Sequence, residues 1–199
     1  MSQHSNQDND RHGARQPERF DPERASRLDD PARFEYLSPE EVVRMLDAPT
    51  NGRVLDFGTG TGTYAIELAR LRPDVEVIAM DEQPAMLDRL REKPAAASLP
   101  NLKPMLAAQG AGLQGQIDRV LALNVLHELG DEALRGLRAL LKPGGAALFI
   151  DWNAEVDRPA GPPRDHVYSP AEARARLESL GFQIEIERLF PYHYAFRAR

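Results

Sequence analysis

The chain has 199 residues, a formal net charge of −6 and a sequence pI of about 5.4. Hydrophobic residues make up 42% of it, which is enough to build the core of one domain of ordinary size. The acidic balance argues against a nucleic-acid or anionic-membrane surface, because phosphate binding relies on clustered Lys and Arg. The sequence contains no cysteine, which excludes disulfides, thiolate metal sites and cysteine nucleophiles.

Residues 1–19 are polar and are expected to be disordered, because they cannot bury enough surface to offset chain entropy. They lack the apolar stretch of a signal peptide, and no apolar run approaches the roughly 20 residues of a membrane span. We therefore expect a cytoplasmic protein with one folded domain over residues 20–199. Residues 20–50 are expected to form a helical lead-in or lid, and residues 51–199 an α/β core.

Residues Arg24–Tyr36 alternate charged with large apolar residues and predict a short helical or looped segment. Ser38–Glu41 is a capping box with proline at the first helical position, which predicts a helix to about Ala48. After a turn at Pro49–Gly52, short apolar segments alternate with segments of helical spacing. In chain order these are strand Arg53–Phe57, helix Thr61–Leu71, strand Val75–Met80, helix Pro84–Arg91, strand Asn101–Ala107, strand Ile117–Leu123, helix Glu132–Leu141 and strand Ala146–Asp151.

The end of the chain continues this pattern. Pro143–Gly145 ends the helix before the fifth strand, and Ser169–Glu172 begins a last helix that stops at Gly181. The segments Phe182–Leu189 and Tyr192–Arg197 then predict two strands that pair as an antiparallel hairpin, since a parallel pair needs a long crossover. The fold class is therefore expected to be α/β, with a doubly wound, mostly parallel sheet of seven strands and helices on both faces.

A glycine-rich turn joins the first strand to the next helix. Gly58, Gly60 and Gly62 allow a ligand to approach the backbone closely, and the helix N-terminus points at that ligand. The turn does not match the dinucleotide-binding fingerprint G-x-G-x-x-G, because Thr63 occupies the position of its last glycine. Asp56 would repel a pyrophosphate, and its burial is costly without a partner. A cofactor that carries an ammonium group supplies that partner.

Asp81 ends the second strand, where an acid accepts hydrogen bonds from both ribose hydroxyls of a nucleoside. The pattern thus favours a nucleoside with a zwitterionic tail and no phosphate, a description that S-adenosylmethionine fits. Structural roles stay open for both acids: Asp56 as a hydrogen-bond acceptor in the turn, and Asp81 as a cap of the following helix.

The segment Asp56–Gly62 resembles the first motif of class I S-adenosylmethionine-dependent methyltransferases. Further segments resemble, in order, the family's second motif, its fourth-strand region and its turn before strand five: Val77–Asp81 with Pro84–Leu87, Ile117–Val120 with Leu126–Leu129, and Leu141–Gly145. The match covers about Phe20–Arg199, and the most similar group is the ubiquinone/menaquinone-biosynthesis-like (type 11) methyltransferases. The resemblance implies a Rossmann-like methyltransferase fold over residues 20–199 and in-line transfer of a methyl group from S-adenosylmethionine to a small-molecule acceptor.

The resemblance also implies roles for single residues. Asp56 would lie near the methionine amino group, Asp81 would hold the ribose, and Asn124 would lie on the sulfonium side. The cofactor contacts implied in this way are Asp56, Gly58, Thr59, Gly60, Gly62, Asp81, Gln83, Met86, Ala108, Gln109, Asn124 and Val125. One position departs from the family, because relatives often carry an acid after strand three. Here Gln109 or a backbone carbonyl would substitute for it.

Two candidate bases follow strands four and five, at the rim where ligands bind in open α/β sheets. His127 has an ordinary pKa suited to proton transfer, and Asp151 is the second candidate. A structural role stays open for each: His127 as packing beside the cofactor or a helix cap, and Asp151 as the acceptor of a loop hydrogen bond. The acceptor pocket is expected to be lined by Arg33, Tyr36, Trp152, His166, Tyr168 and His193.

No metal is expected, because Asn124, Asp151 and Asn153 hold one carboxylate between them and Mg²⁺ usually needs more charge. Two other functions stay open. One is an NAD-dependent oxidoreductase on a similar fold, against which Asp56 and Thr63 argue, and the other is a non-catalytic S-adenosylmethionine-binding protein. The expected partner is a small-molecule methyl acceptor, with no nucleic acid and no membrane span, and the chain is expected to be a monomer or a homodimer.

Overall fold

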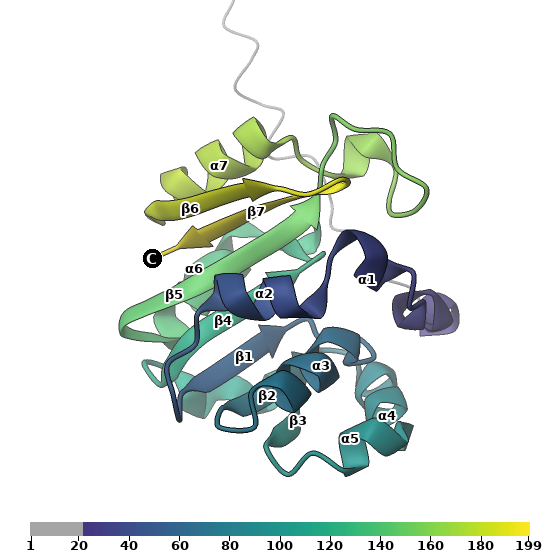
Figure 1. Cartoon of the computed structure of the whole chain (residues 1–199). Coiled ribbons are helices and arrows are strands. Elements are labelled where there is room, and N and C mark those ends of the chain that lie inside the picture. The colour runs from purple at the N-terminus through teal and green to yellow at the C-terminus, as the bar shows by residue number, and fades with distance from the viewer. Residues whose placement is uncertain (1–21) are drawn as a thin grey trace, which may run out of the picture.

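A seven-stranded sheet forms the centre of the computed structural model, which describes residues 22–199, with side chains from Ala25 on; the tail predicted to be disordered lies outside these residues. The strand order is β3-β2-β1-β4-β5-β7-β6 (Figure 1). The strands are β1 Arg53–Phe57, β2 Glu76–Asp81, β3 Leu102–Leu106, β4 Ile117–Leu123, β5 Leu141–Trp152, β6 Ile184–Leu189 and β7 His193–Ala198. The first five run parallel, and β7 is antiparallel to both β5 and β6. The predicted doubly wound sheet with a C-terminal hairpin is confirmed.

Helices cover both faces of this sheet (Figure 1). The α-helices are α1 Arg33–Tyr36, α2 Pro39–Leu46, α3 Thr63–Leu71, α4 Pro84–Glu92, α5 Pro94–Ala97, α6 Asp131–Leu140 and α7 Pro170–Ser179. The 3₁₀ helices are η1 Pro22–Asp29, η2 Ala107–Leu113, η3 Leu126–Glu128 and η4 Arg164–His166. None of these helices is long and apolar enough to cross a membrane.

The residues of β4 show why helices pack against both faces of the sheet. Successive side chains of a strand point to opposite faces. Leu121 and Leu123 therefore pack into the cluster that contains α2 and α3, whereas Val120 and Ala122 pack into the cluster that contains α6 and α7. All four are buried, as expected for a strand in the middle of a parallel sheet.

Both predicted capping serines begin a helix. The hydroxyl of Ser38 accepts a hydrogen bond from the Glu41 N–H at 3.2 Å, and α2 starts at the next residue, Pro39. Ser169 and Glu172 form the reciprocal capping box at the start of α7. The chain leaves α7 at Gly181, whose φ of +84° lies in the region that favours glycine.

The start of β5 was predicted wrongly. The strand begins at Leu141 rather than at Ala146, and α6 ends before it at Leu140. Ile117 pairs with Leu141 while Arg119 pairs with Ala146, so Pro143–Gly145 lie in an irregularity of the pairing between β4 and β5. A bulge takes up extra residues of one strand, and glycine and proline suit it as well as they suit a turn. The short helix α5 was not predicted at all.

The carboxyl ends of β1, β2 and β4 meet at one edge of the sheet, beside the N-terminal segment η1–α1 (Figure 1). In open α/β sheets, ligands bind outside the carboxyl ends of the strands. This edge is therefore the first place to look for a functional site.

Candidate active site

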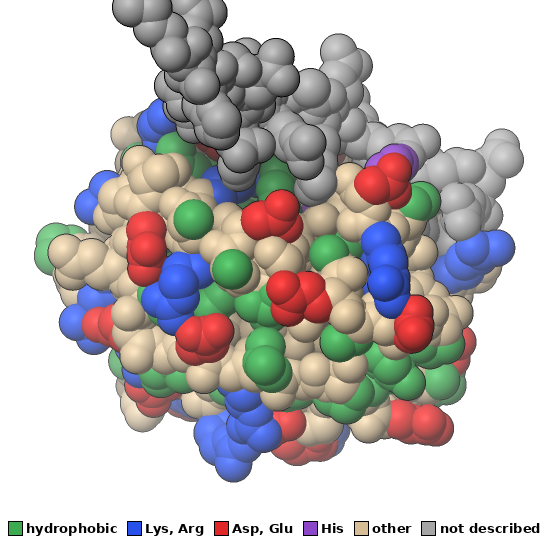
Figure 2. All heavy atoms as spheres, turned by 90° about the horizontal axis from the view of Figure 1, so that it is seen from above, with side chains coloured by type: hydrophobic (Ala, Val, Ile, Leu, Met, Phe, Trp, Pro, Cys, Tyr) green, Lys and Arg blue, Asp and Glu red, His purple; other side chains and the backbone are tan. Residues whose placement is uncertain are grey.

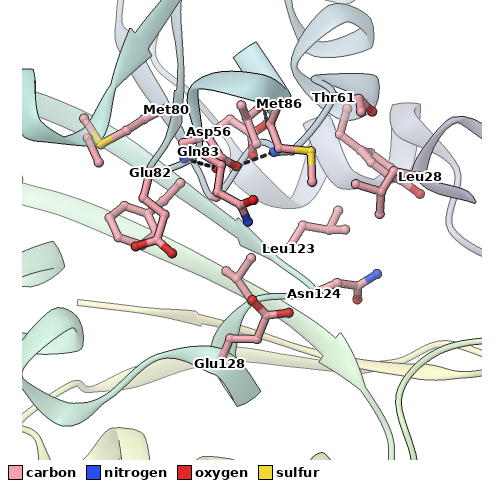
Figure 3. A pocket seen from close by; sticks show the side chains of 18 of the residues that line it. Leu28, Asp56, Thr61, Met80, Glu82, Gln83, Met86, Leu123, Asn124 and Glu128 are labelled. Carbon is pink, nitrogen blue, oxygen red and sulfur yellow. Dashed lines mark hydrogen bonds between the residues drawn. The ribbon is translucent and has the colours of Figure 1, made fainter. Parts of the chain in front are cut away.

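A cavity of about 340 Å³ lies at this edge. It is bounded by the turn after β1, the end of β2 with the start of α4, and the segment after β4 (Figure 3). Ten residues that the sequence analysis singled out line it together: Arg33, Asp56, Gly58, Thr59, Gly60, Asp81, Gln83, Met86, Asn124 and Val125. The fold thus gathers residues from four separate segments around one space.

The glycine-rich turn needs glycine for both conformation and space. Gly58, Gly60 and Gly62 have φ values of +70°, +55° and +75°. A Cβ on Gly58 would lie 2.7 Å from Val125 Cγ1, in the cavity wall. Gly62 does not line the cavity: it is the N-cap of α3, and a Cβ there would lie 2.3 Å from Leu90 Cδ1. Its role is to bring α3 and α4 together.

Asp56 is a buried carboxylate at the end of β1, with 3% of its surface exposed. Its Oδ2 accepts a hydrogen bond from the Thr59 hydroxyl at 2.6 Å. No Lys or Arg among residues 25–199 forms an ion pair with it, and burial raises its pKa to about 6. Burial without a counter-ion opposes the charged form, so the carboxylate is ready to accept a cation.

Asp81 joins the glycine-rich turn to the end of β2. Its Oδ2 accepts a hydrogen bond from the Gly60 N–H at 2.8 Å, and its Oδ1 accepts one from the Gln83 N–H at 2.9 Å. Burial raises its pKa despite these two bonds. The structural alternative therefore holds in part, since Asp81 does bind backbone N–H groups, but its side chain also faces the cavity.

Asn124 stands directly after β4 in a left-handed conformation, with φ +59°. Its backbone N–H donates to the Ile150 carbonyl at 2.7 Å, which fixes the residue beside β5. Its Oδ1 is buried and has no hydrogen-bond partner among the described residues. The side chain lies at the cavity wall near Leu123 (Figure 3), so a bound ligand is the available partner for that oxygen.

The N-terminal segment closes one side of the cavity, where Leu28 and Arg33 line it. Asp29 holds this segment in place: it accepts hydrogen bonds from Lys93 Nζ and the Thr61 hydroxyl, each at 2.6 Å. Lys93 Nζ also donates to the Thr61 carbonyl at 2.7 Å. One lysine therefore connects the covering segment to the glycine-rich turn.

The two candidate bases contact each other and do not line the cavity. His127 Nδ1 lies 2.9 Å from Asp151 Oδ1, and the His127 backbone N–H donates to Asp151 Oδ2 at 2.8 Å. Asp151 is fully buried, and the His127 side chain is 7% exposed. Burial lowers the pKa of His127, but the charge and hydrogen bond of Asp151 outweigh it, and the net direction is upward.

Glu128 is the residue that the sequence analysis missed. It follows His127 in η3, lines the cavity and points into it below Asn124 in Figure 3. Burial raises its pKa to about 7, and one of its oxygens lies 3.6 Å from His127 Nε2. A single turn of 3₁₀ helix has no period from which the direction of its side chains follows, so the sequence carried no signal for this residue.

Most of the predicted acceptor residues do not line the cavity. Tyr36, Trp152 and His193 form an aromatic cluster, with ring centroids of Trp152 and His193 4.1 Å apart. His193 is fully buried, which lowers its pKa to about 3. Tyr168 is buried against Arg176, and His166 is exposed in η4. Of the predicted set, only Arg33 reaches the cavity.

The predicted contacts after β3 are also displaced. Ala108 and Gln109 are exposed, and Ala107 lines the cavity in their place. Gln109 Oε1 instead accepts a hydrogen bond from the Leu106 N–H at 3.2 Å, at the start of η2. The side chain is used as a helix cap and turns back toward its own backbone. Among the described residues, no group of three His, Cys, Asp or Glu side chains is placed to hold a metal ion.

Comparisons with known proteins identify the family. A model described as a methyltransferase domain matches residues 55–147. A solved S-adenosylmethionine-dependent methyltransferase from Aquifex aeolicus is 30% identical with a TM-score of 0.83, over 90% of this chain and 98% of that one. The chain belongs to the S-adenosylmethionine-dependent methyltransferases. The predicted family and its cofactor are thereby confirmed.

Other relatives of this methyltransferase differ in the acceptor that their names describe. A demethylmenaquinone methyltransferase of Deinococcus radiodurans is 51% identical over 107 residues, which is 50% of this chain and 43% of that protein. A 16S rRNA (adenine(1408)-N(1))-methyltransferase of Streptoalloteichus tenebrarius is 32% identical over 123 residues, 55% of this chain and 56% of that enzyme. The chain thus spans less than two thirds of these relatives, and they do not agree on one acceptor.

Proposed function

We propose that the chain transfers a methyl group from S-adenosylmethionine to a small organic acceptor. The observation that carries the proposal is a cavity with two buried side-chain oxygens in need of a partner. The Asp56 carboxylate forms no ion pair among the described residues, although the charge of Arg33 lowers its pKa, and Asn124 Oδ1 has no hydrogen-bond donor among them. A ligand with an ammonium group and a sulfonium supplies the positive charge that such oxygens favour.

The residues around the cavity fit this cofactor. We assign Asp56 to the amino group and the backbone of Gly58 and Gly60 to the methionyl chain. Asp81 retains acceptor capacity beyond its backbone hydrogen bonds and faces the cavity, which suits the ribose hydroxyls. When bound, the cofactor supplies an already activated methyl group. The residues of the chain then need to position the acceptor in line and exclude water.

A small acceptor is favoured over a nucleic acid on size and charge. The cavity volume of about 340 Å³ lies in the usual range for small-molecule sites. On the face shown in Figure 2, the described Lys and Arg side chains are interspersed with Asp and Glu rather than gathered in one patch. The net charge of −6 also argues against a nucleic-acid acceptor. The name of the Deinococcus relative supports a small acceptor, whereas that of the Streptoalloteichus relative describes rRNA.

The test begins with binding. Calorimetry with S-adenosylhomocysteine and with NAD separates the proposal from an oxidoreductase, since binding of NAD alone would reject a methyltransferase. Transfer of a labelled methyl group is then measured on a panel of phenols, quinols and thiols, with ribosomal RNA in parallel. Methylation of RNA alone would replace the small acceptor, and binding without any transfer would favour a non-catalytic protein. A cytoplasmic location and a monomeric or homodimeric state complete the proposal, and sedimentation reports the latter.

A further inference from the structure

The row of side chains Glu128, His127 and Asp151 runs from the cavity into the interior. We propose that Glu128 is the catalytic base of the methyl transfer, and that His127 and Asp151 are residues that position it. The inference rests on the proposed function and limits the chemical class of the acceptor. It assigns an acceptor whose attacking atom still carries a proton in the bound state, as in a phenol or an enol, rather than one that arrives as an anion.

The inner end of the row is rigid because Asp151 is bonded from three sides. Its oxygens accept hydrogen bonds from the Trp152 N–H at 2.7 Å and the His127 N–H at 2.8 Å, and lie 2.9 Å from His127 Nδ1. A carboxylate in this position keeps the proton of the ring on Nδ1. Nε2 is then the nitrogen directed at Glu128, 3.6 Å from its Oε1, so the protonated ring places a positive charge beside that carboxylate.

The outer end of the row is the part that a ligand can touch. The Glu128 side chain is 26% exposed, whereas those of His127 and Asp151 are 7% and 0% exposed. Glu128 alone of the three lines the cavity. His127 was the more attractive candidate in the sequence, but its side chain is directed away from the cavity toward Asp151.

The surroundings of Glu128 place its proton affinity in a useful range. Burial raises its pKa to about 7, His127 lowers it, and the negative charges of Asp151, Asp81 and Glu82 raise it. These groups come from η3, from the end of β5 and from the end of β2. A base is most effective when its pKa is near the working pH. The Glu128 carboxyl has such a pKa because the site partly shields it from water.

The proposed step is balanced in atoms and charge. Glu128 takes the hydroxyl proton of the acceptor while the acceptor's electron pair forms the bond to the methyl carbon. The electrons of the broken methyl–sulfur bond stay on sulfur. A cationic donor, a neutral acceptor and a carboxylate thus become a neutral thioether, a methylated acceptor and a carboxylic acid. Glu128, whose side chain is 26% exposed, then releases the proton to water and restores the carboxylate.

The first test needs no acceptor. Proteins labelled with ¹³C at the glutamate carboxyl carbon are titrated by NMR from pH 5 to pH 9, without cofactor. The wild type is expected to show one carboxyl titrating near neutrality, absent from Glu128→Gln and unchanged in the exposed control Glu132→Gln. In His127→Gln this titration is expected to move to higher pH, because a neighbouring positive charge is lost. If no glutamate titrates near neutrality, or if it survives Glu128→Gln, the assignment is wrong.

The second test uses two probes of similar size, phenol and thiophenol, at pH 8, where thiophenol is already largely deprotonated. Glu128→Gln is expected to lower phenol methylation about 100-fold, the lower end of general-base contributions. Thiophenol methylation should change less than about threefold, and Glu128→Asp should restore part of the phenol rate. Equal losses on both probes would make Glu128 a structural residue. Binding of S-adenosylhomocysteine distinguishes failure of the proposed function from failure of this inference. If the wild type does not bind S-adenosylhomocysteine, the proposed function is rejected. If it binds but Glu128 does not titrate near neutrality, only the assignment of Glu128 is rejected.

Discussion

Replacing the buried Asp56 by asparagine is expected to stabilise the empty protein while weakening cofactor binding. The carboxyl of Asp56 has a pKa of about 6 in the fold, against an ordinary value of 3.8. Between these values the folded state holds more protons than the unfolded chain, so stability falls as the pH rises through this window. The destabilisation is complete above pH 6 and absent below about pH 4.

The magnitude follows from the same two values. Their difference corresponds to about 3 kcal/mol. Asparagine keeps an acceptor for the Thr59 hydroxyl, and the stronger bond of that hydroxyl to the charged carboxylate is already included in the pKa of Asp56. We therefore expect Asp56→Asn to raise the free energy of unfolding by about 3 kcal/mol at pH 8 and by about zero at pH 4.

Urea unfolding of the cofactor-free protein at both pH values measures this effect, and calorimetry with S-adenosylhomocysteine measures the loss of affinity. Thr59→Val is the matched control, because it removes the hydrogen bond of Asp56 and leaves its charge. A loss of stability of equal size at pH 4 and pH 8 would refute the reasoning, since it would mean that Asp56 acts through packing and not through its charge. Unchanged affinity would remove Asp56 from the cofactor site.

Three further predictions concern the walls of the cavity. Asp81→Asn places an NH₂ against the N–H of Gly60 or of residue 83 and should weaken S-adenosylhomocysteine binding by about 1–3 kcal/mol in calorimetry; unchanged affinity would contradict it. Gly58→Ala sets a Cβ 2.7 Å from Val125 Cγ1 at φ +70° and should lower the unfolding temperature, in contrast to Gly136→Ala in open space within α6; equal effects would argue against strain. Lys93→Met should speed proteolysis within residues 22–36, because Asp29 loses its counter-ion, and an unchanged cleavage rate would show that other contacts hold the segment.

Local rules predicted most of the fold. Residues Ile117–Leu123 were predicted with their observed bounds, because the apolar run Val120–Leu123 fits a central parallel strand. The start of β5 was missed because Pro143–Gly145 are compatible with both a turn and a bulge, and only the pairing with β4 decides between them. Local sequence does not contain that information.

The candidate site was predictable where the backbone sets the position of a side chain. Asp56, Asp81 and Asn124 lie at the carboxyl ends of three neighbouring strands, and all three line one cavity. For the predicted acceptor residues, burial of an aromatic side chain satisfies the core as well as a pocket would, and Trp152 at the end of β5 is such a case. The role of Glu128 could not be predicted from the sequence, because the orientation of its side chain depends on the contact between His127 and Asp151, which joins two distant segments.

The contact of Lys93 with both Asp29 and the Thr61 carbonyl has a kinetic consequence. With the cofactor in the cavity as proposed, its exchange would take place past a segment that is held by an ion pair at the protein surface, where dissolved salt screens charges. Higher ionic strength should therefore shorten the residence time of the bound nucleoside, while the buried groups beside the reacting atoms are affected much less. Under the proposed placement of the cofactor, the rate of exchange and the rate of methyl transfer would be set by different parts of the molecule.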